Sequence, residues 1–354
     1  MKKSGIYQPM VLIALTLLIL VPFTDSEACT RFVYKKQKGK VITGRSMDFS
    51  IPIPGNLWIF PRDMQRNGET GEKSSVSWTS KYGSVVITSW DIGVPDGMNE
   101  KGLMANMLYL TESEYPEFEK NGDKKGLAVS LWAQYALDNF ATVAEAVEDF
   151  SKEHFVVVTD YLPGTNSKTT IHLSLSDATG DNAILEYIGG KLYIYHSRDY
   201  NVMTNSPTFD KQLAINGYWN QVNGFEFLPG TNKAADRFAR ANFYLKYLPE
   251  VDSTHIATAT VFSLIRQLSV PYGIQSGHAL DLSTTRWRVV ANQTDLIYYY
   301  EDVLYPNTIW VDLKKIDFSP SSGVRKLPVM AGQPFSGDVT SKFMKAVPFR
   351  FQGI

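Results

Sequence analysis

Residues 29–50 read CTRFVYKKQKGKVITGRSMDFS, and apolar and polar side chains alternate on both sides of Lys38-Gly39. Alternation with a period of two predicts strands, and the turn between them predicts a hairpin whose first strand begins at Cys29. Cys29 is the only cysteine in the chain, so a disulfide within one chain is excluded. We therefore explain this thiol by reactivity rather than by packing.

The segment before Cys29 has the pattern of an export signal. A charged start is followed by an apolar run over residues 10–23 and by small side chains at Ser26 and Ala28. The run is short for a membrane span but fits the central region of a signal peptide. We expect cleavage after Ala28 to remove residues 1–28, so that an exported protein, periplasmic or secreted, begins with Cys29.

A different class of protein also carries a cysteine directly after its leader. Bacterial lipoproteins attach a lipid to that residue, but their pattern expects leucine or a similar apolar residue three positions earlier, where this chain has Ser26. An exported, lipid-anchored binding protein without catalysis is therefore the alternative to an enzyme. Intact mass distinguishes the two, because the anchored form carries a diacylglyceryl adduct on Cys29.

The remainder of the chain predicts one α+β domain over residues 29–354. Hydrophobic residues make up 44% and charged residues 20% of the chain, and the net charge of −1 gives no indication of a nucleic-acid or anionic-membrane partner. Strand patterns and helical patterns occur in blocks, and no linker rich in proline or glycine divides them. The strand patterns cover residues 76–90, 96–110, 170–177, 183–196, 286–302 and 307–316, and the helical patterns cover 126–153, 232–248 and 254–268.

Two local signals support this division. Gly189-Gly190 lies between two strand patterns and predicts a hairpin, whereas Thr142 and Glu145 form a capping-box pattern that opens a helix. Because hairpins connect the strands in place of single crossover helices, we expect antiparallel sheets with helices grouped beside them.

A cysteine at a chain terminus has a chemical advantage over any internal cysteine. Its own α-amine has a pKa of about 7.7–8.0 and can take and return a proton near neutral pH. A free thiol needs such help, because only a few per cent of it is thiolate at neutral pH. Removal of the leader would thus create the general base together with the new terminus.

Arg45 and Asp48 lie on the second strand of the predicted hairpin, which returns beside Cys29. A guanidinium near the sulfur favours the thiolate, and a carboxylate near an ammonium group orients it. An Arg-x-x-Asp pattern also fits a plain ion pair at a strand end, so these two residues alone do not decide between the explanations.

Five strings that follow in order resemble the choloylglycine hydrolase family of N-terminal nucleophile hydrolases, which includes bile salt hydrolases and penicillin V acylases. They are CTRF, GRSMDF, DGMNEKGL, MTNSPTFDKQL and ADRFARA, and the resemblance extends from Cys29 to Trp287. Only the combination is specific. It implies a four-layer αββα fold with two stacked antiparallel sheets, hydrolysis of linear amides, and a homotetramer.

The resemblance also implies roles for individual residues. Cys29 would be the nucleophile and, through its α-amine, the base, with Arg45 and Asp48 beside the thiol and the terminal nitrogen. Asn205 would offer its side-chain amide to the oxyanion, and Arg237 matches the second arginine of the family's site. Without the resemblance, Asn205 is a turn residue before a proline and Arg237 is a charge on a helix surface.

The second oxyanion donor is open between two residues. Bile salt hydrolases commonly have asparagine where this chain aligns Tyr109, whereas penicillin V acylases commonly have tyrosine there. The donor is usually the backbone N–H, so the departure leaves the hydrolysis hypothesis intact and weakens a bile salt assignment. Asn106 is the alternative donor.

The strings LWIFP, WTSKYGS and ESEYP and the leader are similar to the exported Gram-negative branch of the family. That branch includes penicillin V acylases that also cleave N-acyl-homoserine lactones. Met47, Phe49, Trp90 and Tyr109 are then candidates for an apolar wall around an acyl group, although each also fits a core position. An apolar wall suits phenoxyacetyl, fatty acyl and steroid groups alike, so the preferred substrate is not decided.

The remaining motifs give no sign of other chemistry. The five histidines lack metal-ligand spacing, and no glycine-rich phosphate loop is present, so we predict neither a metal nor an organic cofactor. His172 and His196 fall in predicted strands and are expected to be structural. No histidine lies near Cys29 in the sequence to support a Cys-His protease. The expected partner is a small amide with an apolar acyl group.

Overall fold

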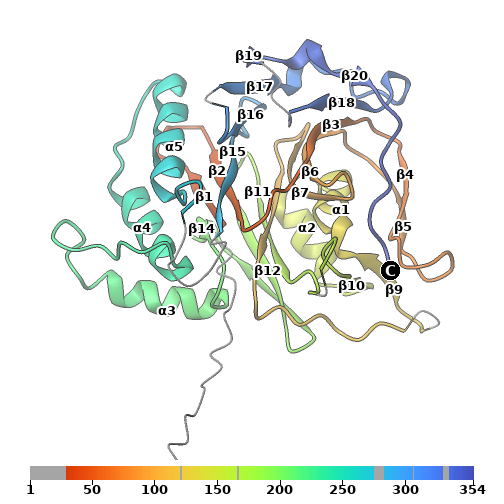
Figure 1. Cartoon of the computed structure of the whole chain (residues 1–354), viewed down its shortest axis with the longest axis horizontal. Helices are drawn as coiled ribbons and strands as arrows, with labels where there is room; N and C mark the ends of the chain where they lie inside the picture. Colours follow the sequence, from red (N-terminus) through yellow and green to blue (C-terminus); the bar gives the residue numbers. More distant parts are fainter. Residues whose placement is uncertain (1–28, 120–121, 166, 275–282, 306, 330–334) are drawn as a thin grey trace, which may run out of the picture.

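Two sheets face each other at the centre of the structure, and helices cover the outer face of each (Figure 1). This order of layers is the αββα arrangement that the family resemblance implies. The signal peptide expected over residues 1–28 lies outside the described residues. The computed structural model describes residues 29–354 apart from residues 120–121, 166, 275–282, 306 and 330–334.

The first sheet has seven strands in the order β14-β1-β2-β15-β16-β17-β19. Its strands are β1 (Thr30–Tyr34), β2 (Ile42–Phe49), β14 (Val202–Met203), β15 (Thr284–Asn292), β16 (Ile297–Asp302), β17 (Thr308–Asp312) and β19 (Gly337–Asp338). All neighbours are antiparallel except β17 and β19. The predicted hairpin after Cys29 is confirmed, because β1 and β2 pair with Thr30 opposite Ser46.

The second sheet has nine strands in the order β13-β12-β11-β8-β7-β6-β3-β18-β20. Its strands are β3 (Asn56–Phe60), β6 (Ser84–Ser89), β7 (Gly93–Asn99), β8 (Met104–Tyr109), β11 (Ile171–Ser176), β12 (Asn182–Ile188), β13 (Lys191–His196), β18 (Arg325–Pro328) and β20 (Met344–Lys345). The hairpin predicted at Gly189-Gly190 is confirmed. Both glycines have positive φ, which the tight turn between β12 and β13 requires.

Five α-helices form the outer layers. They are α1 (Trp132–Asn139), α2 (Val143–Phe150), α3 (Phe209–Trp219), α4 (Ala234–Tyr247) and α5 (Thr254–Leu268). α1 and α2 pack on the nine-stranded sheet, and α4 and α5 pack on the seven-stranded sheet. The predicted cap of α2 is confirmed, because Thr142 Oγ1 accepts the N–H of Glu145 at 3.2 Å.

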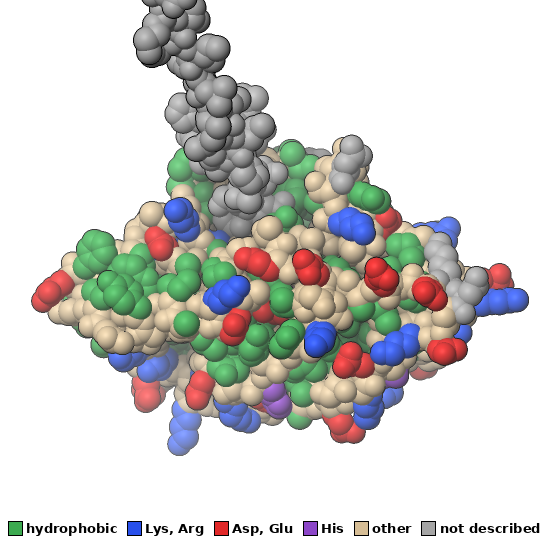
Figure 2. Space-filling view, turned by 90° about the horizontal axis from the view of Figure 1, so that it is seen from below, with side chains coloured by type: hydrophobic (Ala, Val, Ile, Leu, Met, Phe, Trp, Pro, Cys, Tyr) green, Lys and Arg blue, Asp and Glu red, His purple; other side chains and the backbone are tan. Residues whose placement is uncertain are grey.

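Short elements complete the fold. Two small sheets pair β4 (Gln65–Asn67) with β5 (Ser77–Thr79) and β9 (Lys125–Ala128) with β10 (Phe155–Val158), and four 3-10 helices are η1 (Val129–Leu131), η2 (Leu313–Lys315), η3 (Pro320–Ser322) and η4 (Thr340–Lys342). Within the described ranges, no helix is long and apolar enough to cross a bilayer. On the face that Figure 2 presents, basic and acidic side chains are interspersed.

Two details of the predicted element pattern are wrong. Residues 126–128 belong to strand β9, which pairs in parallel with β10; the 3-10 helix η1 follows, and α1 begins only at Trp132. The pattern over residues 76–90 predicts a pair of strands with a turn near Tyr82-Gly83, and two strands exist there but do not pair with each other. β5 pairs with β4, whereas β6 pairs with β3 and β7. Alternation within a segment reports a strand and leaves its partner undetermined.

Candidate active site

Cys29 lies directly before β1, where the register of the β1–β2 hairpin carries it beside β2. Its side chain is nearly buried, with 3% of the residue exposed. The sulfur is 3.7 Å from Met47 Sδ and 3.7 Å from the backbone oxygen of Asp48. The thiol also borders the apolar cavity described below, so it can meet a ligand there.

Asp48 is a fully buried carboxyl beside this thiol. Its Oδ1 accepts the hydroxyl of Thr285 at 2.6 Å, and its Oδ2 accepts that of Ser46 at 3.3 Å. Burial raises the pKa of Asp48 from 3.8 to about 6, and the positive charge of Arg237 and the two hydroxyl bonds oppose this rise. A carboxyl in this state can exchange a proton near neutral pH.

Arg45 lies in a polar layer between the two sheets. Its guanidinium donates to the carbonyl of Met107 at 2.7 Å, is 3.5 Å from Asp96 Oδ2, and lies 4.6 Å above the ring of Trp287. Burial raises the pKa of Asp96, and the charge of Arg45 opposes that rise. The guanidinium approaches the thiol through Met47, whose Sδ is 3.8 Å from Arg45 and 3.7 Å from Cys29 Sγ.

Arg237 connects Asn205 to Cys29. One guanidinium nitrogen of Arg237, on α4, donates to the backbone oxygen of Cys29 at 2.5 Å, and another donates to Asn205 Oδ1 at 2.9 Å. Burial lowers the pKa of Arg237, and the nearby Asp48 and Cys29 oppose this effect. Because Oδ1 of Asn205 faces Arg237, its NH2 group is turned toward Tyr109, whose carbonyl it reaches at 2.8 Å. The second N–H of that amide is left to serve a ligand.

The backbone of Tyr109 points to the same side as this amide. In the antiparallel ladder between β8 and β11, the N–H of Leu110 donates to Thr170 at 3.0 Å. Amide groups of successive strand residues point to opposite edges, so the N–H of Tyr109 points away from β11. Its carbonyl, which accepts the Asn205 amide, lies at that same edge. The two N–H groups can therefore converge on one oxygen.

Asn106 has a different environment. Its Nδ2 donates to Asp96 Oδ2 at 2.6 Å within the polar layer between the sheets, and Asn106 is fully buried. Tyr109 borders the cavity and Asn106 is absent from the described residues that line it. The geometry therefore favours Tyr109 over Asn106 as the second donor.

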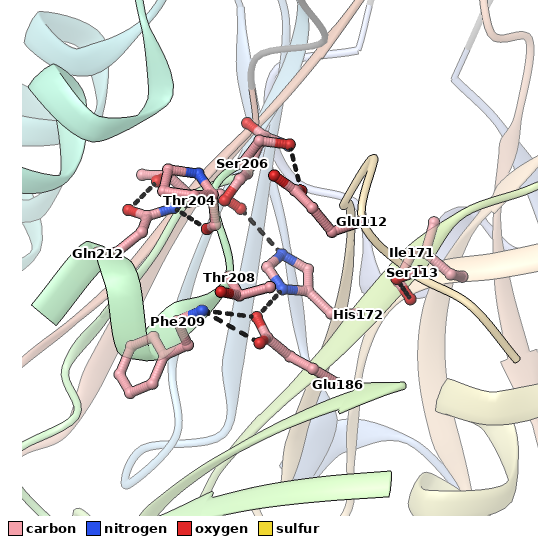
Figure 3. A network of polar contacts seen from close by, with 12 residues as sticks. Glu112, Ser113, Ile171, His172, Glu186, Thr204, Ser206, Thr208, Phe209 and Gln212 are labelled. Atoms are coloured by element: carbon pink, nitrogen blue, oxygen red, sulfur yellow. Dashed lines mark hydrogen bonds and ion pairs between the residues drawn. The ribbon is translucent and has the colours of Figure 1, made fainter. Parts of the chain in front are cut away.

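The loop that carries Asn205 is bonded on two sides (Figure 3). Gln212 on α3 donates to the backbone oxygens of Asn205 and Pro207, and accepts the hydroxyl of Thr204 at 2.8 Å. On the other side, Ser206 donates to Glu112 at 2.7 Å. Sequence reasoning missed Gln212, although it belongs to the same string as Asn205.

An apolar cavity opens beside Cys29. The four residues proposed from the sequence as an acyl-group wall, Met47, Phe49, Trp90 and Tyr109, all line it. Phe49 and Trp90 meet edge to face, with ring centroids 6.4 Å apart. Further apolar residues of the lining are Ile53, Ile92, Val94, Pro95, Met107, Val129, Val158, Leu162, Pro163 and Ile171. The cavity can hold an apolar group next to the thiol.

Gln352 and Asp160 add polar atoms to this lining. The backbone N–H of Gln352 donates to Ile92 at 2.8 Å, and its backbone oxygen accepts the hydroxyl of Ser130 at 2.6 Å. Its side-chain amide donates to Asp160 Oδ2 at 3.1 Å and to the carbonyl of Tyr161 at 2.7 Å. Sequence reasoning missed both residues, because neither lies in a motif or near Cys29 in the chain.

Comparison with known proteins identifies relatives that match most of the chain. The family model described as linear amide C–N hydrolases, choloylglycine hydrolase family, matches residues 29–324. A penicillin V acylase of Pectobacterium atrosepticum is 47% identical over 365 residues, which cover 97% of this chain and 96% of that protein. The solved structure of penicillin V acylase from Agrobacterium tumefaciens has a TM-score of 0.85 and 49% identity, covering 92% of this chain and all of that one.

More distant relatives are named for bile salts or bile acids. A protein of Clostridium perfringens named bile salt hydrolase/transferase is 26% identical over 269 residues, which cover 69% of this chain and 80% of that protein. A variant of conjugated bile acid hydrolase from the same organism has a solved structure with a TM-score of 0.71 and 22% identity, covering 86% of this chain and 99% of that one. This last likeness concerns the fold alone.

Proposed function

The chain belongs to the choloylglycine hydrolase family and is a linear amide C–N hydrolase, and from this premise we propose that it acts as a penicillin V acylase with Cys29 as its nucleophile. The observation that carries the proposal is the apolar cavity beside the Cys29 thiol, lined by Phe49, Trp90 and Tyr109. The proposal includes export and removal of residues 1–28, because only that cleavage gives Cys29 a free α-amine.

The first step is attack on the amide carbonyl. The sulfur of Cys29 forms a bond to the carbonyl carbon, the thiol proton passes to the α-amine, and the carbonyl π electrons move to the oxygen. The negative oxygen is held by the Asn205 side-chain amide and the backbone N–H of Tyr109, which point to the same edge of β8. Preorganised donors of this kind stabilise charge where it develops.

The second step releases the amine and regenerates the thiol. The α-ammonium gives its proton to the leaving nitrogen as the C–N bond breaks, and a thioester remains on Cys29. The α-amine then takes a proton from water as the water oxygen attacks the thioester. When the C–S bond breaks, the proton returns to the sulfur, and a carboxylic acid leaves.

Asp48, Arg237 and Arg45 support these steps. Asp48 is the carboxylate that would orient the α-ammonium. Its side chain is fully buried and hydrogen-bonded to Ser46, so solvent does not screen the carboxylate charge. Arg237 fixes the carbonyl of Cys29 and the amide of Asn205 with one rigid group. Arg45 holds the β8 backbone through Met107.

The cavity also suits fatty acyl chains, so N-acyl-homoserine lactones form a second candidate substrate class. Conjugated bile salts are the alternative, supported by the 26% identical relative. The test is a panel of penicillin V, glyco- and tauro-conjugated bile salts and N-acyl-homoserine lactones of several chain lengths. The protein should first be confirmed by intact mass to begin with unmodified Cys29.

Penicillin V should give the highest kcat/KM on this panel, and Cys29→Ala should abolish turnover of every substrate. Preference for a bile salt would move the assignment to the alternative. Retention of activity by Cys29→Ala would refute the nucleophile, and a lipid adduct on Cys29 would support the anchored binding protein instead.

The homotetramer implied by the resemblance remains part of the proposal. Exposed aromatic side chains of α3, α4 and the segment between them support it, because they give copies of the chain an apolar face for contact. These residues are Tyr218, Phe225, Phe227 and Tyr247. Light scattering of the purified protein should give four times the mass of the mature chain, and a monomer mass would contradict this prediction.

A further inference from the structure

A buried histidine and a buried glutamate lie directly behind the Asn205 loop (Figure 3). His172, on β11, is 1% exposed, and Glu186, on the neighbouring strand β12, is fully buried. Nδ1 of His172 is 2.8 Å from Glu186 Oε1, and Nε2 is 3.0 Å from the backbone oxygen of Thr204. Both ring nitrogens therefore have a partner: Glu186 faces Nδ1, and the Thr204 carbonyl faces Nε2.

Both partners of this ring are acceptors. A carbonyl oxygen can only accept a hydrogen bond, whereas a neutral imidazole carries a single N–H. Glu186 also accepts the backbone N–H of Phe209, at 3.2 Å from Oε1 and 3.1 Å from Oε2, so both of its oxygens serve as acceptors. Both contacts are satisfied when His172 carries a proton on each nitrogen and donates to Glu186 and to Thr204.

The hydrogen bond between His172 and the Thr204 carbonyl acts on Asn205, the proposed oxyanion donor, through a single peptide group. The carbonyl of Thr204 and the backbone nitrogen of Asn205 belong to the same rigid plane. The next carbonyl, that of Asn205, accepts the side-chain amide of Gln212. The backbone of Asn205 is thereby fixed on both sides, and it places the side-chain amide that Arg237 and Tyr109 orient.

We propose that His172, held doubly protonated by Glu186, is a positioning residue that fixes the Thr204 carbonyl and with it the oxyanion amide of Asn205. This inference rests on the proposed hydrolase mechanism, because the position of that amide matters only if it stabilises an oxyanion. His172 acts through the loop and touches neither the substrate nor the sulfur.

Three variants separate this role from simple packing. In Glu186→Gln, the new amide can donate to Nδ1 and accept the N–H of Phe209, so a neutral His172 keeps its bond to Thr204. In His172→Gln, the amide supplies a donor to only one of its two neighbours, and an oxygen is left facing an acceptor. The double variant again matches donors with acceptors.

We expect a variant to keep its kcat where hydrogen-bond donors face acceptors, and to lose kcat where two acceptors face each other. His172→Gln should lower kcat roughly 10- to 100-fold with little change in KM, because misplaced oxyanion donors act on the transition state. Glu186→Gln should stay within about twofold of the parent, and the double variant should recover most of the loss. Activity is divided by the concentration of folded protein, obtained from circular dichroism and urea unfolding of each variant, so that a loss of stability does not imitate a loss of kcat.

His196→Gln is the matched control. His196 also pairs with a carboxylate, Asp181, at 2.8 Å, but it is exposed at the end of β13 and has no described contact with the Asn205 loop. Its replacement should leave kcat unchanged. A normal kcat in His172→Gln would overturn the proposal.

A second measurement does not depend on turnover. Nitrogen-15 NMR of histidine-labelled protein, with His172→Gln to assign the signal, should show a proton on both ring nitrogens of His172. A ring nitrogen without a proton would overturn the inference even in an active enzyme. If the parent protein hydrolyses no amide of the panel, the proposed function fails, whereas the NMR result still reports the state of the pair.

Discussion

Arg237 donates a hydrogen bond to the backbone oxygen of Cys29 at 2.5 Å, although the two residues are 208 positions apart in the chain. The same guanidinium holds Asn205, so the proposed nucleophile and the proposed oxyanion donor share one rigid support. A planar group with several fixed N–H directions can bridge two acceptors in this way, whereas an ammonium is a compact point charge. The relative position of thiol and oxyanion amide therefore depends on α4.

Replacing Arg237 by lysine should disturb both residues at once. Lysine cannot reproduce the fork, so buried acceptors on Cys29 and Asn205 lose their donor, which typically destabilises a protein by about 1–3 kcal/mol for each group. We expect a lower midpoint of urea unfolding and a kcat reduced by at least about tenfold. Urea titration and steady-state kinetics measure the two effects, and a lysine variant with parental kcat would contradict the shared support.

Replacing Asn205 by alanine should slow the chemical step and leave the fold intact. Removal of one oxyanion donor typically lowers the rate about 10²- to 10³-fold. Circular dichroism should match the parent, and kcat should fall by that factor on the best substrate of the panel. Near-normal turnover would remove Asn205 from the oxyanion site and reopen the assignment of both donors.

Asp48 makes stability dependent on pH while Ala28 remains attached to Cys29. Its pKa is raised from 3.8 to about 6, so between these values the folded chain binds more protons than the unfolded chain. The free energy of unfolding therefore falls as pH rises through this window, by about 3 kcal/mol in total. Below pH 3.8 the group contributes no difference, and above pH 6 the full destabilisation is present.

Urea unfolding at pH 4 and pH 7 measures this change in the free energy of unfolding. Asp48→Asn is the variant that has no titrating group at this position. The stability of the parent relative to Asp48→Asn should fall between pH 4 and pH 7. In the mature chain the new ammonium of Cys29 favours the carboxylate, so the same comparison should give a smaller fall. A relative stability that is independent of pH in the uncleaved chain would contradict the raised pKa.

Asp160 should select against acyl groups that carry a negative charge. Among the described residues that line the cavity, it is the only charged one. Asp160→Asn should raise kcat/KM for an amide with a glutaryl acyl group by roughly tenfold and leave penicillin V nearly unchanged, because a like-charge repulsion is removed. Asp199→Asn, at an exposed carboxyl outside the lining, is the control. An equal change for both substrates would argue against charge selection.

The parts of the fold that were predictable are those set by neighbours in the sequence. The hairpin after Cys29 and the turn at Gly189-Gly190 follow from alternation and turn chemistry within about 20 residues. Residues 126–128 were mistaken for helix, because their strand exists through pairing with β10 and local pattern does not report that partner.

The residues of the site also divide into those that a local sequence pattern predicted and those that depend on tertiary packing. Met47 and Asp48 meet Cys29 through the register of one hairpin, which the alternation already predicted. The approach of Arg237 from α4 depends on tertiary packing, and only the family resemblance placed it in the site. Gln352 meets Asp160 across 192 positions and lies in no motif, so the sequence offered no signal for it.

Gln352 lies beyond residue 324, where the match to the family model ends, yet it forms part of the cavity wall. The proposed reacting groups, in contrast, belong to Cys29 just before β1, to β2 and β8, and to the loop before α3. Part of the cavity wall is thus encoded outside the stretches that carry the proposed reacting groups, although Met47, Phe49 and Tyr109 of the same wall lie on β2 and β8. Replacement confined to position 352 could diversify the acids that are released and leave the turnover machinery as it is.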